Sequence, residues 1–285
     1  MTATCDVCFR HCHIEEGAYG ACRARRNVNG SIVCDAYGRL TGVALDPIEK
    51  KPLYHFHPGS MILSVGSYGC NLHCPFCQNH EISLSGASDI PVEFMRLEAT
   101  PPEAVVEAAL KYREAGNIGV AFTYNEPLVS YEYLRDTARL VHEAGLYNVL
   151  VTAGIAEAHI LDAIRPYVDA MNIDLKAFRA ETYEKTLGGN LQQTLSFIET
   201  AASFCHVEIT TLIVPGMNDS EEEIREIASW IASLNHGKGT GIPYHLSRFF
   251  PRNRMRDAAP TDVGLIYHLV DVAREKLLHV YPGNC

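Results

Sequence analysis

Apolar and polar residues follow two regular patterns from residue 61 to the end of the chain. Short β-branched runs, typical of buried strands, take turns with longer stretches whose apolar residues recur at helical spacing. The predicted strands are 61–66, 119–124, 147–154, 170–176, 206–214 and 241–247. The predicted helices are 101–116, 129–145, 156–167, two pieces within 179–203, 220–234 and 261–277. This alternation predicts a parallel α/β sheet.

The strand–helix units number six, fewer than the eight of a closed TIM barrel. We therefore expect an α/β fold in which residues 61–285 form a partial (β/α)6 TIM-type barrel. A doubly wound sheet is the second choice. In both architectures the loops at the carboxyl ends of the strands carry the chemistry.

Residues 1–60 differ in composition: they are rich in cysteine and glycine and show no long stretch of helical periodicity. The segment 27–38 predicts a β-hairpin with Asn29 and Gly30 in its turn. This stretch has too few apolar residues to form a stable hydrophobic core. We therefore expect a small N-terminal cysteine-rich module that a bound metal or cofactor stabilises.

The net charge of the chain limits the classes of partner that it attracts. A formal net charge of −10 gives no general attraction for phosphate backbones or anionic lipid, which disfavours a nucleic-acid partner. No run approaches the roughly 20 apolar residues of a membrane span, and the N-terminus has no apolar signal-peptide core. We expect a cytoplasmic protein with no membrane partner, whose clustered cysteines bind metal rather than form disulfides.

Three of the ten cysteines follow the first predicted strand with the spacing C-x3-C-x2-C. Cys70, Cys74 and Cys77 could ligate three corners of a [4Fe-4S] cluster and leave one iron open to another ligand. One alternative is a zinc knuckle completed by His73 or His80. Another is a redox disulfide between Cys74 and Cys77, which leaves Cys70 without a role.

A second group of cysteines, Cys5, Cys8, Cys12 and Cys22, lies near the N-terminus. Their short spacings suit one closed tetrahedral site, so structural zinc is the favoured interpretation. A second iron–sulfur cluster, serving as an auxiliary redox centre, is the alternative.

An aromatic residue, Phe76, stands directly before the third cysteine of the C-x3-C-x2-C motif. In this the sequence resembles the radical S-adenosylmethionine superfamily. Within it, the chain is similar to pyruvate formate-lyase activating enzyme-like proteins. It is most similar to the radical enzyme of the AmmeMemoRadiSam system, through its N-terminal cysteines and the segment 46–60. The resemblance implies a [4Fe-4S] cluster and S-adenosylmethionine as cofactors, with Phe76 beside them, and a low-potential electron donor such as flavodoxin or ferredoxin.

Two later motifs extend this resemblance. TYNEP (123–127) stands where many members have Gly-Gly-Glu, which makes Asn125 and Glu126 candidates for holding the methionine amino group. Thr152 in VTAG matches the end of the third strand, while Val151 replaces an aspartate that contributes to a cation site in the activating enzymes. Glu126 could instead be an acid at a helix N-terminus.

The remaining motifs match the fourth and sixth strands. Asp174 and Lys176 in NIDLKAF are candidates for contacting the ribose hydroxyls or the methionine carboxylate, and His245 in PYH is expected beside the cofactor. All of these residues are expected at the carboxyl ends of strands. The alternatives are an internal ion pair between Asp174 and Lys176 and a packed core histidine.

The resemblance implies that S-adenosylmethionine is cleaved to a 5′-deoxyadenosyl radical that abstracts hydrogen from an unidentified substrate. A second hypothesis is an activase that installs a glycyl radical on a partner protein. A third, of another class, is a non-catalytic zinc-binding interaction protein. The segment 247–256, with four arginines, either lines the mouth of the site or is a solvated loop.

Overall fold

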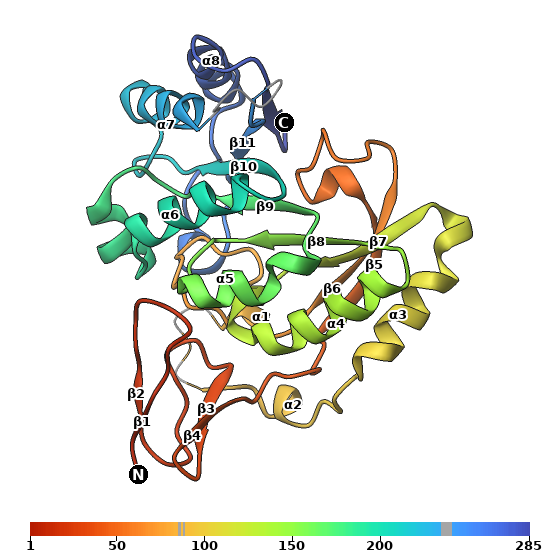
Figure 1. The fold of residues 1–285 in the computed structure, drawn as a ribbon. Helices are drawn as coiled ribbons and strands as arrows, with labels where there is room; N and C mark the ends of the chain where they lie inside the picture. Colours follow the sequence, from red (N-terminus) through yellow and green to blue (C-terminus); the bar gives the residue numbers. More distant parts are fainter. Residues whose placement is uncertain (85–86, 88, 235–240) are drawn as a thin grey trace.

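The structure is a computed structural model that describes residues 1–84, 87, 89–234 and 241–285. Its main feature is an eight-stranded sheet in the order β12-β11-β10-β9-β8-β7-β6-β5 (Figure 1). Neighbouring strands from β6 to β12 are parallel, and β5 is antiparallel to β6. The strands of this sheet are β5 (Gly42–Pro47), β6 (Met61–Gly66), β7 (Asn117–Phe122), β8 (Tyr147–Thr152), β9 (Ala170–Asp174), β10 (His206–Ile213), β11 (Tyr244–Arg248) and β12 (Val280–Gly283).

Each parallel strand lies beside the one that precedes it in the sequence. This is the order of a TIM-type barrel, whereas a doubly wound sheet reverses its order at a switch point. Within the described residues no pairing joins β12 to β5, so the barrel is open. The expected partial (β/α)6 barrel is therefore confirmed, and the sheet has two strands beyond the six we predicted, the parallel β12 and the antiparallel β5.

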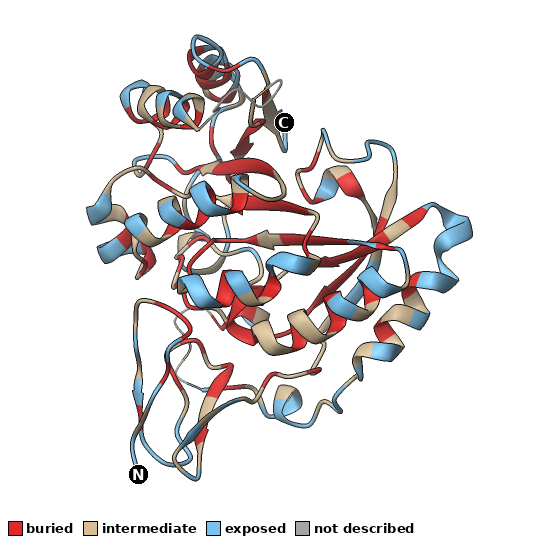
Figure 2. Ribbon diagram, in the orientation of Figure 1, coloured by how far each residue is buried: buried red, intermediate tan, exposed pale blue. Residues whose placement is uncertain are grey.

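Helices cover the outer face of the sheet, with their buried sides against the strands (Figure 2). In α4 the buried Leu134, Ala138 and Val141 recur at helical spacing and form that side. The α-helices are α1 (His80–Ser83), α2 (Val92–Met95), α3 (Pro102–Lys111), α4 (Tyr131–Glu143), α5 (Ala158–Ile164), α6 (Leu191–Ala202), α7 (Glu221–Ser233) and α8 (Val263–Arg274). The shorter helices are η1 (Ile48–Lys50), η2 (Arg113–Ala115), η3 (Pro127–Ser130), η4 (Arg165–Tyr167), the π-helical η5 (Thr182–Leu187) and η6 (Asn253–Met255). Among the described residues, none of these helices has the length and apolar character to span a membrane.

The N-terminal strands form two small antiparallel pairs, β1 (Ala3–Thr4) with β2 (His13–Ile14) and β3 (Arg25–Val28) with β4 (Ser31–Cys34). The predicted hairpin is confirmed: Asn29 and Gly30 join β3 to β4, with φ of 54° and 79°. Positive φ at both central residues is the mark of a type I′ turn, which Asn-Gly favours.

The N-terminal module lies over the carboxyl ends of the barrel strands (Figure 1). Its contacts reach the loops after four successive strands. The Cys22 carbonyl accepts a hydrogen bond from the Cys70 N–H after β6, and the Arg25 guanidinium donates to the Val129 carbonyl after β7. The Val7 carbonyl accepts from the Glu157 N–H after β8, and Arg10 donates to the Gly188 carbonyl after β9. The module therefore covers the face of the barrel where the chemistry is expected.

The opposite end of the barrel is closed by the chain between β5 and β6. Ile48 and Leu53 are fully buried against apolar side chains near the amino ends of the strands. The Pro52 carbonyl accepts a hydrogen bond of 2.9 Å from the Asn172 side chain on β9. Residues 42–60, which we grouped with the N-terminal module, thus pair and pack with the barrel. How residues 1–60 and 61–285 divide into domains stays a prediction.

Candidate active site

The cysteine motif occupies the loop that leaves the carboxyl end of β6. Cys74 is buried, while Cys70 and Cys77 are half-buried. Phe76 is buried in the same loop. The motif therefore lies where parallel α/β barrels carry their reactive groups, as predicted.

Asparagine side chains tie this loop to TYNEP, the loop after β7. The Asn125 amide donates to the Gly69 carbonyl and accepts from the Ser67 N–H, each at 3.0 Å. The Asn79 side chain donates to the Tyr124 carbonyl at 2.8 Å. The polar residues that replace the family's glycines in TYNEP thus fix the cysteine loop in place.

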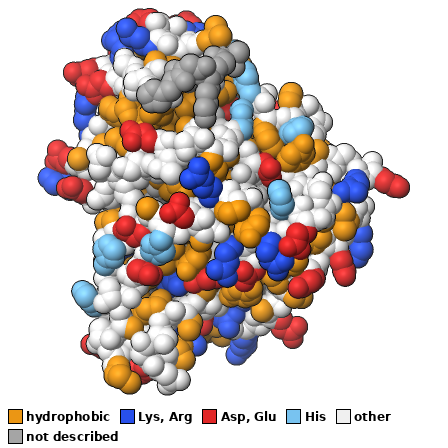
Figure 3. Space-filling view, viewed as in Figure 1, with side chains coloured by type: hydrophobic (Ala, Val, Ile, Leu, Met, Phe, Trp, Pro, Cys, Tyr) orange, Lys and Arg blue, Asp and Glu red, His pale blue; other side chains and the backbone are white. Residues whose placement is uncertain are grey.

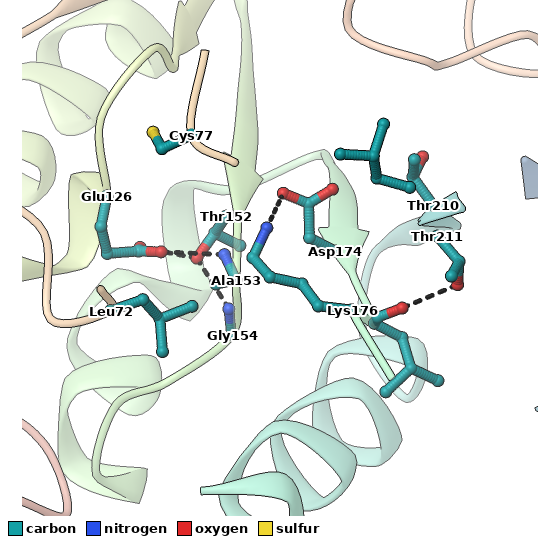
Figure 4. Close-up of polar contacts among 12 residues, drawn as sticks. Leu72, Cys77, Glu126, Thr152, Ala153, Gly154, Asp174, Lys176, Thr210 and Thr211 are labelled. Carbon is teal, nitrogen blue, oxygen red and sulfur yellow. Dashed lines mark hydrogen bonds and ion pairs between the residues drawn. The ribbon is translucent and has the colours of Figure 1, made fainter. Parts of the chain in front are cut away.

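The carboxylate of Glu126 is buried and joins the end of β7 to the end of β8 (Figure 4). It accepts hydrogen bonds from the Thr152 hydroxyl at 2.7 Å, the Ala153 N–H at 2.8 Å and the Leu128 N–H at 3.1 Å. Burial raises the pKa of Glu126, although these hydrogen bonds oppose the rise. Because three protein donors already use this carboxylate, its predicted contact with an ammonium group stays a prediction.

Asp174 ends β9, and its carboxylate lies 2.8 Å from the Lys176 ammonium (Figure 4). The internal ion pair considered as an alternative is therefore present. Burial alone would lower the pKa of Lys176, but the charges of Asp174 and Cys74 raise it well above its usual range. The pair remains at the strand end beside the cysteine loop, where a bound anion or hydroxyl group could reach it.

The thiols of the motif raise one another's pKa. Burial raises the pKa of Cys70, and the Glu126 carboxylate and the Cys74 thiol raise it further. Burial also raises the pKa of Cys74 to about 11, against the opposing charge of Lys176. The structure thus brings the motif, the end of β7 and the end of β9 together at one site.

A single zinc ion and a [4Fe-4S] cluster need different arrangements of the thiols. Thiolates on one zinc ion lie about 2.3 Å from the metal and so about 4 Å from one another. Within the described chain no three His, Cys, Asp or Glu side chains converge in that way. The His73 ring packs close to Gly188, and burial and the nearby Arg10 charge lower its pKa. Three thiols in one loop match the three protein ligands that one [4Fe-4S] cluster would need if its fourth iron stayed open.

His245 lies elsewhere than we predicted. It is the second residue of β11, so its expected position at a strand carboxyl end is wrong. Its imidazole Nε2 lies 2.7 Å from the Glu208 carboxylate, and its ring meets Tyr54 edge-on at 4.7 Å. The strand begins later than predicted because residues 241–243 precede its first pairing, between Ile209 and Tyr244. His245 matches the packed, satisfied histidine that was the alternative.

Two contacts near the site were not predicted from the sequence. The loop after β11 contacts the cysteine motif, since the Asn253 side chain donates to the Cys74 carbonyl at 3.3 Å. Beneath TYNEP, the Asp46 carboxylate accepts from the Lys51 ammonium at 2.8 Å and the Tyr124 hydroxyl at 3.0 Å. Asn253 belongs to the arginine-rich segment that we considered, whereas Asp46 and Tyr124 are far apart in the sequence, so their contact gave no local signal.

The four N-terminal cysteines also come together. Cys5, Cys8, Cys12 and Cys22 line one small cavity, and Asn71 of the cysteine motif loop lines its wall. Cys34 is not among its lining residues. The two predicted cysteine groups are thus neighbours in space, which their separation in the sequence did not indicate.

Comparison with known proteins agrees with this arrangement. Residues 64–231 match the model of the Radical SAM superfamily. An uncharacterized protein of Methanocaldococcus jannaschii, MJ0808, is 38% identical over 98% of this chain and 80% of its own length. The pyruvate formate-lyase-activating enzyme of Clostridium pasteurianum is 25% identical over 62% of this chain and 72% of its own.

Solved structures share the fold at low identity. A domain of a pyruvate-formate lyase-activating enzyme from Bacteroides vulgatus has a TM-score of 0.50 and 20% identity, over 58% of this chain and 99% of that one. SuiB of Streptococcus suis bound to its precursor peptide SuiA has a TM-score of 0.57 and 13% identity, over 76% of this chain and 47% of that one. The family match spans more than half of the chain, and the protein therefore belongs to the radical SAM superfamily.

Proposed function

We propose that Cys70, Cys74 and Cys77 hold a [4Fe-4S] cluster at which S-adenosylmethionine is reductively cleaved. When bound, the cluster supplies one electron to the sulfonium, and the resulting 5′-deoxyadenosyl radical abstracts hydrogen from a substrate. The observation that carries this proposal is the loop of three thiols beside the ends of β7 and β9. An open iron beside those strand ends leaves room for the methionine group.

The surrounding residues then orient the cofactor. Asn125 holds the Gly69 carbonyl of the cysteine loop, and Glu126 ties the loop after β7 to the end of β8, where the amino group binds in this proposal. Thr152 supports Glu126, and the Asp174–Lys176 pair offers a carboxylate to ribose hydroxyls and an ammonium to the methionine carboxylate. The N-terminal module over this face keeps water away from the radical.

The experiment is anaerobic reconstitution of the full chain with iron and sulfide, followed by dithionite and S-adenosylmethionine. We expect cluster absorbance near ~400 nm and formation of 5′-deoxyadenosine. Cys74→Ala should abolish the product, whereas Cys205→Ala, which changes a thiol just before the amino end of β10, should not. A reconstituted protein that lacks both signals would exclude the radical function and leave the zinc-binding interaction protein.

This proposal has two versions, which differ in the class of substrate. A small-molecule or peptide substrate suits the general radical enzyme, while the 25% identity to a pyruvate formate-lyase-activating enzyme favours an activase acting on a partner protein. Acidic and basic side chains are interspersed on the face in Figure 3, unlike the basic surface of a nucleic-acid-binding protein. A glycyl radical signal on an added partner protein, measured by electron paramagnetic resonance, would select the activase.

A further inference from the structure

We propose that Cys5, Cys8, Cys12 and Cys22 hold a second iron–sulfur cluster of the [4Fe-4S] type, adjacent to the cysteine motif after β6. Its pairing with a first cluster at Cys70 rests on the proposed function. The site itself follows from the N-terminal residues alone.

The four thiols surround one small cavity. Cys5, Cys8 and Cys22 are less than one tenth exposed, and they line this cavity together with Cys12. In the part of the chain that the structure describes, no three metal-ligating side chains converge on a single point. Four separated thiols around a cavity suit the four corners of a cubic cluster.

The wall of the cavity supplies positive charge. Arg25 and Arg10 both line it. Arg25 is neutralised by two hydrogen bonds of 2.8 Å to the Glu132 carboxylate. Arg10 donates to the carbonyls of Asn71 and Gly188 and, within the described residues, pairs with no carboxylate. A cluster with four thiolates is an anion, so the uncompensated Arg10 charge stabilises it.

The cavity also touches the other cysteine group directly. The Cys70 N–H donates to the Cys22 carbonyl at 3.2 Å, and Asn71, next to Cys70, lines the cavity. On its other side Cys12 is half-buried and His11 is exposed. The N-terminal site thus lies between solvent and the Cys70 loop, which is the place for an electron entry point. One electron from a low-potential one-electron donor protein would reduce this cluster, and its transfer to the Cys70 site would reoxidise it.

The test is the metal content of the full chain after anaerobic reconstitution with iron and sulfide. We expect about eight irons per chain in the native protein. About four should remain in Cys70→Ala/Cys74→Ala/Cys77→Ala and about four in Cys5→Ala/Cys8→Ala. Cys205→Ala, the matched control, should keep about eight. About four irons in the native protein, with or without one zinc, together with no iron in Cys70→Ala/Cys74→Ala/Cys77→Ala, would overturn the second cluster.

A spectroscopic measurement separates this proposal from the function of the first site. In Cys70→Ala/Cys74→Ala/Cys77→Ala reduced with dithionite, the remaining cluster should give a paramagnetic signal that added S-adenosylmethionine leaves unchanged. If only the second cluster is wrong, native protein holds about four irons and this triple variant holds none. If only the proposed function is wrong, the native protein also holds about four irons, but the triple variant retains them.

Discussion

The Thr152 hydroxyl at the end of β8 donates a 2.7 Å hydrogen bond to the Glu126 carboxylate at the end of β7. The same carboxylate accepts from the Ala153 N–H at 2.8 Å. These hydrogen bonds join the ends of β7 and β8 next to the cysteine motif. The TYNEP loop cannot shift without breaking buried hydrogen bonds, which are expensive to leave unmade.

Changing Glu126 to Gln should loosen this connection. Glutamine keeps the shape but replaces one acceptor oxygen with an NH2 donor that faces protein donors, and the site is buried. We expect a loss of about 2 kcal/mol in unfolding free energy and about tenfold weaker binding of S-adenosylmethionine to the reconstituted protein. Urea unfolding and anaerobic calorimetry measure the two effects. Thr152→Ser, which keeps the hydroxyl, is the control, and native stability of Glu126→Gln would contradict this role of the hydrogen bonds.

Asn125 should matter more for metal retention than for stability. Asn125→Ala removes the hydrogen bonds to Gly69 and Ser67 that hold the cysteine loop. We expect iron bound at the cysteine motif to be lost several-fold faster to a chelator. Asn148→Ala is the matched control, because its side chain bridges Ala138 and Tyr167 at the far end of β8. Equal iron loss from the two variants would mean that Asn125 acts only through general stability.

Gly69 allows the N-terminal module to approach the cysteine motif. Its φ is +90°, and a Cβ there would stand 2.5 Å from the Cys22 carbonyl oxygen. Gly145 has a similar φ of +69°, but a methyl group added there would point into open space. Gly145→Ala should therefore cost about 1 kcal/mol of backbone strain, and Gly69→Ala clearly more, since a backbone atom must move. Chemical denaturation of both variants tests this, and equal losses would remove the steric argument.

Local patterns predicted much of this molecule. The strand–helix alternation indicated the barrel, and Asn29-Gly30 indicated the hairpin, because both depend on residues that are close in the sequence. The cysteine spacing likewise located the motif after the first parallel strand. The features that could be predicted are therefore mainly those formed by residues close to one another in the sequence.

Long-range contacts escaped prediction for the same reason. No residue of β5 is fully buried and Val43 is exposed, so its pairing with β6 left no clear alternation of buried and exposed residues. The hydrogen bond between Cys22 and Cys70 joins residues that are far apart in the sequence. His245 resembled a site residue, but its position depends on where β11 begins and on Glu208 from another strand. Only the folded chain reveals such partners.

Glu208 should make the stability of the barrel depend on acid pH. The side chain is fully buried, and burial alone would raise its pKa. Hydrogen bonds from His206, His245 and the N–H groups of Tyr54 and His55 outweigh that effect and lower the pKa from 4.5 to about 2. Since the folded pKa is the lower one, the stabilisation is present above pH 4.5 and is lost as the pH falls toward 2.

Glu208→Gln should therefore lose about 3 kcal/mol of unfolding free energy at neutral pH. The gap to the native protein should shrink as the pH falls below 4.5, because the native carboxylate then takes up its proton. Urea unfolding across this range measures the gap. Glu143→Gln, which changes an exposed carboxylate paired with Arg139 on α4, should cost less than about 0.5 kcal/mol at every pH. A gap for Glu208→Gln that stays constant with pH would mean that lost packing, and not the ionised carboxylate, accounts for the destabilisation.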